Sequence, residues 1–284
     1  MSLESYQSRV NQKLDQYLQN NNALTEAMRY SVLVGGKRFR PILTYTTGQL
    51  YSTDLDLLDS SACAIELIHA YSLIHDDLPA MDDDEIRHNQ PANHKAFGEA
   101  HAILAGDALQ SLAFDILARD NHIEPSVRIH LIKALTGAAF DMAEGQAIDL
   151  SVVGKKITVE DLAKMHRKKT GALLTCAVEM GALLSSDCKQ KDKQLLLDFA
   201  QAIGLAYQIQ DDVLDIESPT EVLGKKQNSD SDKGKPTYPG LIGLQESKQS
   251  FKDLYQEALG YLTGLSVDAE PMIKLTNKLM QRQF

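Results

Sequence analysis

The sequence predicts an all-α protein, a single-domain antiparallel helical bundle that spans residues 1–284 and surrounds a large central cavity. Apolar residues recur at helical spacing almost throughout the chain, and the alternation typical of strands is scarce. Only 8 Pro and 17 Gly interrupt the 284 residues, of which 43% are hydrophobic. Such a chain can form long helices and bury a large core.

The expected helices follow one another with short connections. The segment 60–78 is typical, because Ser60 or Ser61 can cap it and Pro79 ends it by disfavouring helical backbone in the residue before it. The helices are expected over residues 2–20, 23–34, 38–50, 55–78, 95–119, 124–148, 158–185, 190–216, 237–263 and 267–283.

Two connections are longer than a compact bundle needs, about 83–94 and about 217–236. Both are polar, and each follows directly on a cluster of aspartates and carries Arg or Lys. Long polar loops inside a compact domain are usually functional or disordered. Because both loops lie beside the acidic clusters, we expect them to be functional lids and not disordered connections.

Composition excludes several function classes. A net charge of −10 argues against a nucleic-acid surface, which needs a basic face. The three cysteines are widely spaced and form no C-x-x-C pair, so we expect buried, reduced thiols and neither disulfides nor zinc. The first residues lack an apolar signal core, and no uninterrupted apolar stretch reaches the ~18 residues of a membrane span. We therefore expect a cytoplasmic protein without stable membrane insertion.

Two aspartate clusters carry the functional signal, one over residues 76–82 and one over residues 211–215. Each follows a long apolar helical run. Crowded carboxylates repel one another unless cations lie between them, and Mg²⁺ takes one or two carboxylates and completes its shell with water and phosphate oxygens. The clusters thus predict opposed walls around a diphosphate bridged by magnesium. The alternative is a solvated acidic helix end, which is the commoner explanation of a single acidic run.

The spacing within each cluster suits metal binding. Asp211 and Asp215 are four residues apart and lie about 40° apart on one helix face. Asp76 and Asp82 are six apart and would diverge by about 120° on an unbroken helix. Because Pro79 breaks that helix, the chain has the freedom to bring Asp82 back beside Asp76.

Basic groups accompany the clusters. His69 stands seven residues before the first aspartate, nearly on the same helix face. A lone histidine at such a position is more often a core residue with its hydrogen bonds made than a ligand. The segment 35–41 opens a helix with two glycines and three cations, which is typical of an anion seat. The segments 167–171 and 225–226 add further cations. Each alone is typical of a solvated face, but together they suit a phosphate site.

Six motifs follow one another between about residues 30 and 245: GGKRFRP (35–41), IELIHAYSLIHDDLPAMDDDEIRH (65–88), FGEAHAILAGDAL (97–109), RKKTGALL (167–174), YQIQDDVLD (207–215) and GKPTYP (234–239). In this order they resemble the trans-isoprenyl diphosphate synthases, most closely the bacterial farnesyl diphosphate synthases (geranyltranstransferases). The resemblance implies a polyprenyl synthase domain of the isoprenoid-synthase type over residues 1–284.

The resemblance also implies a reaction: Mg²⁺-dependent condensation of isopentenyl diphosphate with dimethylallyl and geranyl diphosphates to farnesyl diphosphate. The allylic diphosphate ionises, the isopentenyl double bond attacks the cation, and a proton is lost. Three Mg²⁺ per site are implied, with Mn²⁺ as a substitute, in a homodimer. The implied roles are metal ligation by Asp76, Asp82 and Asp211, with Asp215 acting through water; isopentenyl diphosphate binding by Lys37, Arg40 and His69; allylic diphosphate binding by Arg87, Lys169 and Lys225; and stabilisation of the cation by Thr170 and Gln208.

Two positions concern specificity. The family has Arg-Arg-Gly after the first cluster, where this chain has Arg87-His88-Asn89. Neutral imidazole offers one donor where guanidinium offers five, so we expect a weaker or more pH-dependent site for isopentenyl diphosphate. In the family, an aromatic residue five positions before the first aspartate accompanies a C15 product. Tyr71 is that residue and Ser72 leaves room beside it, although an aromatic on a buried helix is as often only packing.

Other activities remain as alternatives. A geranylgeranyl or geranyl diphosphate synthase would share every motif, and product length separates them. A terpene cyclase would carry an Asn/Asp–Ser/Thr–Glu second motif where this chain has a second aspartate cluster. A His-Asp phosphohydrolase would need more histidines than His69 and His75, which diverge by about 120° on a helix. A regulatory subunit of a two-component synthase would lack one acidic motif.

Overall fold

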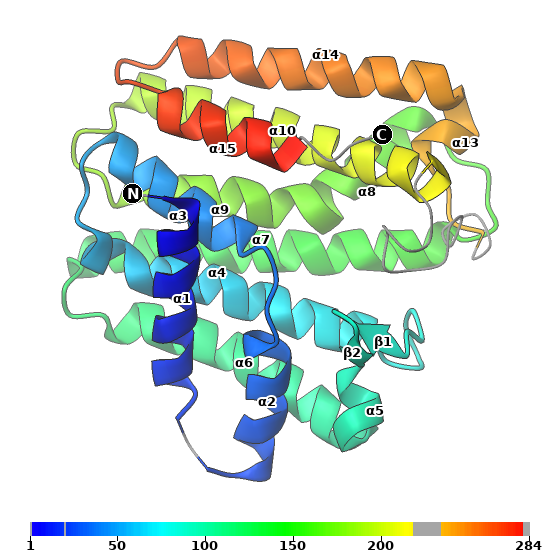
Figure 1. The fold of residues 1–284 in the computed structure, drawn as a ribbon, viewed down its shortest axis with the longest axis horizontal. Coiled ribbons are helices and arrows are strands. Elements are labelled where there is room, and N and C mark those ends of the chain that lie inside the picture. Colours follow the sequence, from blue (N-terminus) through cyan, green and yellow to red (C-terminus); the bar gives the residue numbers. More distant parts are fainter. Residues whose placement is uncertain (1, 20, 218–233, 281–284) are drawn as a thin grey trace. The chain divides into compact units, whose positions relative to one another are not determined.

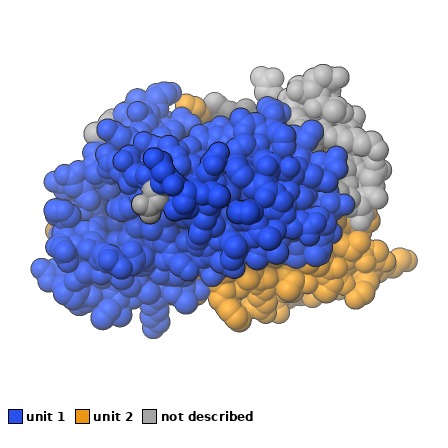
Figure 2. Space-filling model, turned by 90° about the horizontal axis from the view of Figure 1, so that it is seen from below, with its two compact units in different colours: residues 1–136, 180–186 blue, residues 137–179, 187–284 orange. Residues whose placement is uncertain are grey.

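The computed structural model describes residues 2–19, 21–217 and 234–280, and over these residues the chain is almost entirely helical (Figure 1). The prediction of an all-α protein is confirmed. Packing divides the chain into two compact units, unit 1 with residues 1–136 and 180–186 and unit 2 with residues 137–179 and 187–284 (Figure 2). The unit boundaries fall inside two continuous helices, α7 (Pro125–Val152) and α9 (Ala172–Leu183).

Unit 1 is built mainly from the N-terminal helices. Side chains cap the first turns of some of these helices: Ser2 accepts from the backbone N–H of Ser5, and Asn22 accepts from that of Thr25. Besides the first part of α7 and the end of α9, the elements are α1 (Leu3–Tyr17), α2 (Ala23–Leu33), α3 (Phe39–Leu50), α4 (Leu55–Asp76), β1 (Ile86–Arg87), β2 (Gln90–Pro91), α5 (Asn93–Phe97) and α6 (Glu99–Arg119).

Helix α4 is the centre of unit 1. It packs against α3 and α6, and its side chains are buried on nearly every face. Asp54 caps its start, and the helix ends at Asp76, three residues before Pro79. By length and mean hydropathy α4 could cross a membrane, but 78% of its most apolar window is buried inside the protein. These properties are those of a core helix, apolar all round because it is covered all round.

The first long loop contains a small hairpin that the sequence did not predict. Strands β1 and β2 pair antiparallel, with Ile86 opposite Pro91 and Arg87 opposite Gln90. His88 and Asn89 form the turn with φ of 52° and 61°, as a type I′ turn requires. The positively charged motif after the first acidic cluster is therefore held by backbone hydrogen bonds and is not a loose lid.

Unit 2 holds the C-terminal helices. Thr158 and Asp161 form a capping box at the start of α8, and Thr237 caps α13. Besides parts of α7 and α9, the elements are α8 (Val159–His166), the π-helix η1 (Arg167–Gly171), α10 (Gln190–Glu217), α13 (Tyr238–Ile242), α14 (Leu244–Thr263) and α15 (Glu270–Met280).

Helix α10 is the centre of unit 2 and packs along α14 and against η1. Its fully buried side chains include Leu196, Phe199 and Ala206. The expected helix 237–263 is interrupted at Gly243, and the expected helix 95–119 in unit 1 at Gly98, because both residues have positive φ, 88° and 85°. The remaining helices lie within a few residues of the predicted ranges.

The cysteines agree with the expectation of free thiols. Cys63 and Cys176 are buried and Cys188 is half-buried, and all three are unpaired with one another. Burial raises the pKa of Cys63 and of Cys176, so both thiols stay protonated at neutral pH.

Candidate functional site

The first acidic cluster is a tight turn at the C-terminal end of α4. Asp76 is the last helical residue, and the backbone N–H of Asp82 donates to the carbonyl oxygen of Asp76 over 2.9 Å. The chain therefore returns after Pro79, as the sequence predicted for the backbone. Asp76 and Asp82 are half-buried, whereas Asp77 is 2% exposed.

Arg87 anchors the buried member of this cluster. Its Nε lies 3.0 and 3.2 Å from the two carboxylate oxygens of Asp77, a second guanidinium nitrogen also bonds Asp77, and Asp84 lies 3.4 Å away. Burial raises the pKa of Asp77, and the ion pair with Arg87 only partly offsets this shift. Arg87 thus ties the hairpin to the end of α4, close to the half-buried aspartates.

Cations gather around His69 in the same unit. Burial lowers the pKa of His69, and repulsion from Arg40, then from His88 when it is protonated, and from Arg38 and Arg87 lowers it further. His69 is therefore neutral at pH 7. Arg40, Arg87 and His88 are thus electrostatic neighbours of His69, and the sequence predicts that all four residues bind substrate phosphate. Lys37, which has the same predicted role, lies exposed on the loop before α3.

The predicted chain-length residues lie on α4 one turn before Asp76. Tyr71 is buried at 9% exposure, and its ring meets that of His75 edge to face with centroids 5.7 Å apart. His75 in turn hydrogen-bonds the carbonyl oxygen of Ile103 on α6 over 3.0 Å. Ser72 is half-buried and donates to the carbonyl oxygen of His69 over 2.8 Å. The Tyr71 ring is therefore held in place by its neighbours.

The second acidic cluster lies near the end of α10 in unit 2. Asp212 is 3% exposed and accepts from the backbone N–H of Tyr238 over 3.0 Å and from Gln208 Nε2 over 3.2 Å. His166 Nε2 lies 3.5 Å from the same carboxylate. Asp211 is half-buried and Asp215 is 2% exposed. The Asp212 carboxylate thus links α10 to α13 through Tyr238 and to α8 through His166.

Both clusters share one arrangement. In each Asp-Asp pair the second residue, Asp77 or Asp212, is buried and bonded within its unit, while the first, Asp76 or Asp211, is half-buried. Adjacent residues on a helix point about 100° apart, so a pair at the edge of a core has one side chain inward and one outward. The inward carboxylates are structural, and the outward ones are those that the sequence assigned to metal.

The RKKTG motif forms the π-helix η1, where the sequence predicts an unbroken α-helix over residues 158–185. A Cβ on Gly145 of α7 would lie 2.3 Å from the backbone nitrogen of Lys169, so α7 packs directly on the backbone of η1. π-turns inside α-helices are frequent at functional sites. Thr170 Oγ1 donates to Gln208 Oε1 over 3.0 Å, which links η1 to α10 and to Asp212 beyond it.

Two functional candidates, Asp149 and Lys235, are not among the site residues that the sequence predicts. Asp149 is 3% exposed and accepts from Lys169 Nζ over 2.6 Å and from Lys235 Nζ over 3.3 Å. Burial alone would raise the pKa of Asp149, but the two lysines outweigh burial and hold it below its usual range. A signal existed, because Gln146 and Asp149 are polar residues in a buried helical stripe that also contains Ala138 and Met142.

The donors of both units fit divalent metal. Among the described residues no group of three or more His, Cys, Asp or Glu side chains converges into a metal cage. Mg²⁺ does not need such a cage, since it keeps several waters and binds through one or two carboxylates together with phosphate oxygens. Half-buried Asp76, Asp82 and Asp211 are donors of that kind. Lys225 and most of the second long loop lie outside the described residues.

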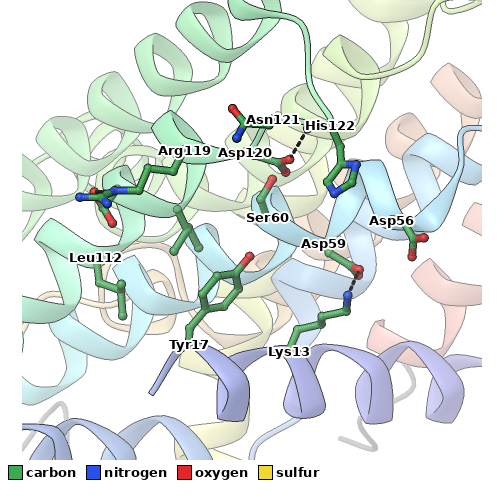
Figure 3. Close-up of a pocket in the computed structure, with 12 residues that line it drawn as sticks. Lys13, Tyr17, Asp56, Asp59, Ser60, Leu112, Arg119, Asp120, Asn121 and His122 are labelled. Atoms are coloured by element: carbon green, nitrogen blue, oxygen red, sulfur yellow. Dashed lines mark hydrogen bonds and ion pairs between the residues drawn. The ribbon is translucent and has the colours of Figure 1, made fainter. Parts of the chain in front are cut away.

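A cavity of about 580 Å³ lies elsewhere in unit 1, between α1, α4 and α6 (Figure 3). Lys13 and Asp59 in its wall form an ion pair over 2.9 Å. Ser60, near the start of α4, also lines it. Sixteen residues of helix separate Ser60 from Asp76, about 24 Å at 1.5 Å per residue. This cavity is therefore not the diphosphate site that the motifs predict.

Comparison with known proteins gives one consistent result. Residues 21–266 match the family model described as polyprenyl synthetase. The chain is 44% identical to farnesyl diphosphate synthase of Escherichia coli (99% of this chain, 97% of that protein) and 48% identical to that of Haemophilus influenzae (94% and 92%). The crystal structure of geranylgeranyl pyrophosphate synthetase from Pyrococcus horikoshii superposes with a TM-score of 0.90 at 29% identity (99% of this chain, 97% of that chain).

Proposed function

Because the chain belongs to the polyprenyl synthetase family, we propose that it condenses isopentenyl diphosphate with dimethylallyl and then geranyl diphosphate to give farnesyl diphosphate. The observation that carries this proposal is the shared arrangement of the two Asp-Asp pairs. Each pair uses its second carboxylate for structure and leaves the first at the rim of its unit. Two such carboxylates beside clustered cations suit magnesium diphosphate chemistry.

We assign Asp76, Asp82 and Asp211 as Mg²⁺ ligands, with three ions per site, with Mn²⁺ as a substitute metal and with Asp215 acting through water. The metal, when bound, would neutralise the negative charge of the diphosphate oxygens and so make the diphosphate a better leaving group. The buried partners Asp77 and Asp212 orient these ligands, because each fixes the backbone next to the residue that binds.

Isopentenyl diphosphate is assigned to the cations of unit 1. Lys37, Arg40 and His69 hold its phosphates, with His88 contributing a single donor in place of the second family arginine. His69 acts as a neutral hydrogen-bond donor, in keeping with its lowered pKa. The positive charge of Arg40 also lowers that pKa, so Arg40 lies within electrostatic reach of His69, which supports assigning both to the same headgroup.

The allylic diphosphate is assigned to Arg87, Lys169 and Lys225. Asp149 fixes the Lys169 ammonium at 2.6 Å, so its position is set before substrate binds. The Thr170 hydroxyl donates its hydrogen bond to Gln208 Oε1, which leaves the lone pairs of the Thr170 oxygen to stabilise the developing allylic cation. The buried carboxylate of Asp212 accepts from Gln208 Nε2 and so orients the Gln208 amide, whose oxygen in turn holds the Thr170 hydroxyl.

The reaction needs charge stabilisation and exclusion of water, and no protein nucleophile. The allylic C–O bond breaks and its electron pair leaves with diphosphate. The isopentenyl double bond then attacks the cation, and the new cation loses a proton to the released diphosphate. The protein's groups lower the barrier by holding fixed positive charge where negative charge develops and fixed dipoles where the cation forms.

Tyr71 is proposed to stop chain growth at C15. It is buried, braced by His75 and placed one turn below Asp76, with the smaller Ser72 beside it. A geranylgeranyl or geranyl diphosphate synthase remains the alternative activity, since those enzymes share the motifs, and a terpene cyclase is the more distant one. The identity of the side chain at position 71 favours the C15 product.

We further propose that residues 1–284 act as one polyprenyl synthase domain in a cytoplasmic homodimer that binds no nucleic acid. The family match runs across both units. Exposed large apolar side chains support contact with a second copy: Ile103 and Leu104 on α6 are 44% and 54% exposed, and Ile129 on α7 is 66% exposed. Light scattering coupled to size exclusion measures the oligomeric state, and a monomer at micromolar concentration would refute the dimer.

Incubation with labelled isopentenyl diphosphate, each allylic primer and Mg²⁺, followed by sizing of the products, tests the activity. We expect C15 from dimethylallyl and geranyl diphosphates and none after chelation of the metal. Asp211→Asn should lower turnover by about a hundredfold or more, since it removes a charge from the metal site. Asp198→Asn on the same helix, remote from the cluster, is the matched control. Cyclic products, free phosphate release without condensation, or no turnover would each contradict the proposal.

A further inference from the structure

The loop before α3 has an unusual backbone. Gly35, Gly36 and Arg38 all have positive φ, 118°, 124° and 49°. A non-glycine residue such as Arg38 pays a conformational cost in this region, so surrounding contacts must hold it there. The loop carries Lys37 and leads directly to Arg40, two of the groups assigned to isopentenyl diphosphate. Its shape therefore decides where those charges stand.

Two side chains of α1 hold this loop. Gln7 Nε2 donates to the carbonyl oxygen of Gly36 over 2.7 Å, and Asn11 Oδ1 accepts from Arg38 Nε over 2.7 Å. Residues four apart lie on one helix face, so Gln7 and Asn11 bond the loop from the same side, at Gly36 and Arg38, the two residues that flank Lys37. Helix α1 lies before residue 21, where the match to the family model begins.

The other end of the Arg38 guanidinium is buried. It donates to Glu66 Oε1 over 2.7 Å and to the carbonyl oxygen of Val32, and the side chains of Arg38 and Glu66 are 4% and 7% exposed. The Arg38 side chain is thus held in place by bonds to α1, to the end of α2 and to α4. Glu66 lies three residues before His69, on the same side of α4.

We propose that Gln7 and Asn11 are positioning residues for isopentenyl diphosphate: acting through the 35–38 loop and the buried Arg38, they place Lys37 and Arg40 for its phosphates. This inference rests on the proposed function. It gives α1 a role in substrate affinity, in addition to its packing in unit 1. The allylic diphosphate, assigned to Arg87, Lys169 and Lys225, should not depend on it.

Steady-state kinetics of Gln7→Ala, Asn11→Ala and the double variant test the proposal. We expect the KM for isopentenyl diphosphate to rise about fivefold in each single variant and more than tenfold in the double variant, the loss of one or two good hydrogen bonds. The KM for geranyl diphosphate and kcat should stay within about twofold. Gln12→Ala, exposed on the same helix, is the control and should match the wild type.

Two measurements separate positioning from a general loss of structure. Asn11→Asp keeps an oxygen acceptor for Arg38 and should restore the wild-type KM. Calorimetric titration of isopentenyl diphosphate into protein without allylic substrate should show the same loss of affinity without turnover. An unchanged KM for isopentenyl diphosphate, or a parallel loss of both KM values, kcat and Tm, would overturn the proposal. A wild type that binds isopentenyl diphosphate but forms no C15 product would refute the proposed function instead.

Discussion

Replacing Asp149 with Asn removes the negative charge that pairs with both Lys169 and Lys235. The side chain of Asp149 is 5% exposed and those of the two lysines 25% and 15%, so the contacts of 2.6 and 3.3 Å are well shielded from water. Hydrogen bonds to charged groups contribute about 1.5–3 kcal/mol each. The lysines can turn partly into solvent, and Asn keeps one acceptor. We therefore expect a loss of about 2–3 kcal/mol in the free energy of unfolding.

Urea unfolding at pH 7 measures this loss, and Asp141→Asn provides the matched control. Asp141 pairs with the neighbouring Lys168 over 2.6 Å, but it is 48% exposed and Glu144 also bonds that lysine. Exposed pairs contribute about 0–1 kcal/mol, so the control should lose less than about 0.5 kcal/mol. If Asp149→Asn lost no more than Asp141→Asn, the assignment of a shielded ion network at Asp149 would be wrong.

The same variant tests the active-site role of Lys169. With Asp149 neutral, the ammonium group of Lys169 is no longer fixed, and we expect kcat/KM for geranyl diphosphate to fall about tenfold. The stability effect should depend on pH. The pKa of Asp149 is depressed, so its stabilisation is present above the unfolded pKa of about 3.9 and is lost as pH falls through the lower folded pKa. The difference between wild type and variant should be constant from about pH 5 to 8 and shrink below about pH 4.

Three further substitutions test other parts of the site. Tyr71→Ala should yield products longer than C15 in the sizing assay, and unchanged products would refute a chain-length role. Partial desolvation and the positive charges of Arg87 and Arg38 lower the pKa of His88, so His88 is neutral at pH 7. His88→Arg should therefore lower the KM for isopentenyl diphosphate severalfold and flatten the pH dependence of that KM. An equal KM in the variant and the wild type would contradict this reasoning. Gly145→Ala should cost about 2–4 kcal/mol, because its Cβ would lie 2.3 Å from backbone, whereas Gly137→Ala on the same helix meets nothing within 4 Å and should be neutral or stabilising.

The helices were predictable because their signals are local. Periodic apolar residues and the proline at position 79 each act within a few residues of chain. The cap expected at Ser60 or Ser61 was wrong, because both serines lie inside α4, which Asp54 caps. The π-turn at 167–171 was not predictable in this way. At this turn the backbone of η1 packs against α7 at Gly145, a contact between separate parts of the sequence that local patterns do not reveal. The hairpin at His88 and Asn89 was missed because neither residue is the glycine that usually marks such a turn.

What the sequence alone determined was the residue chemistry: two aspartate clusters, the cations near them and the order of six motifs, all readable as types at fixed spacing. Only the tertiary structure decided which carboxylates are structural, since Asp77 and Asp212 differ from Asp76 and Asp211 by their buried partners and not by their neighbours in the chain. The same holds for Asp149, whose lysines lie 20 and 86 residues away. Burial and ion pairing depend on what packs against a side chain in three dimensions, which local sequence patterns do not specify.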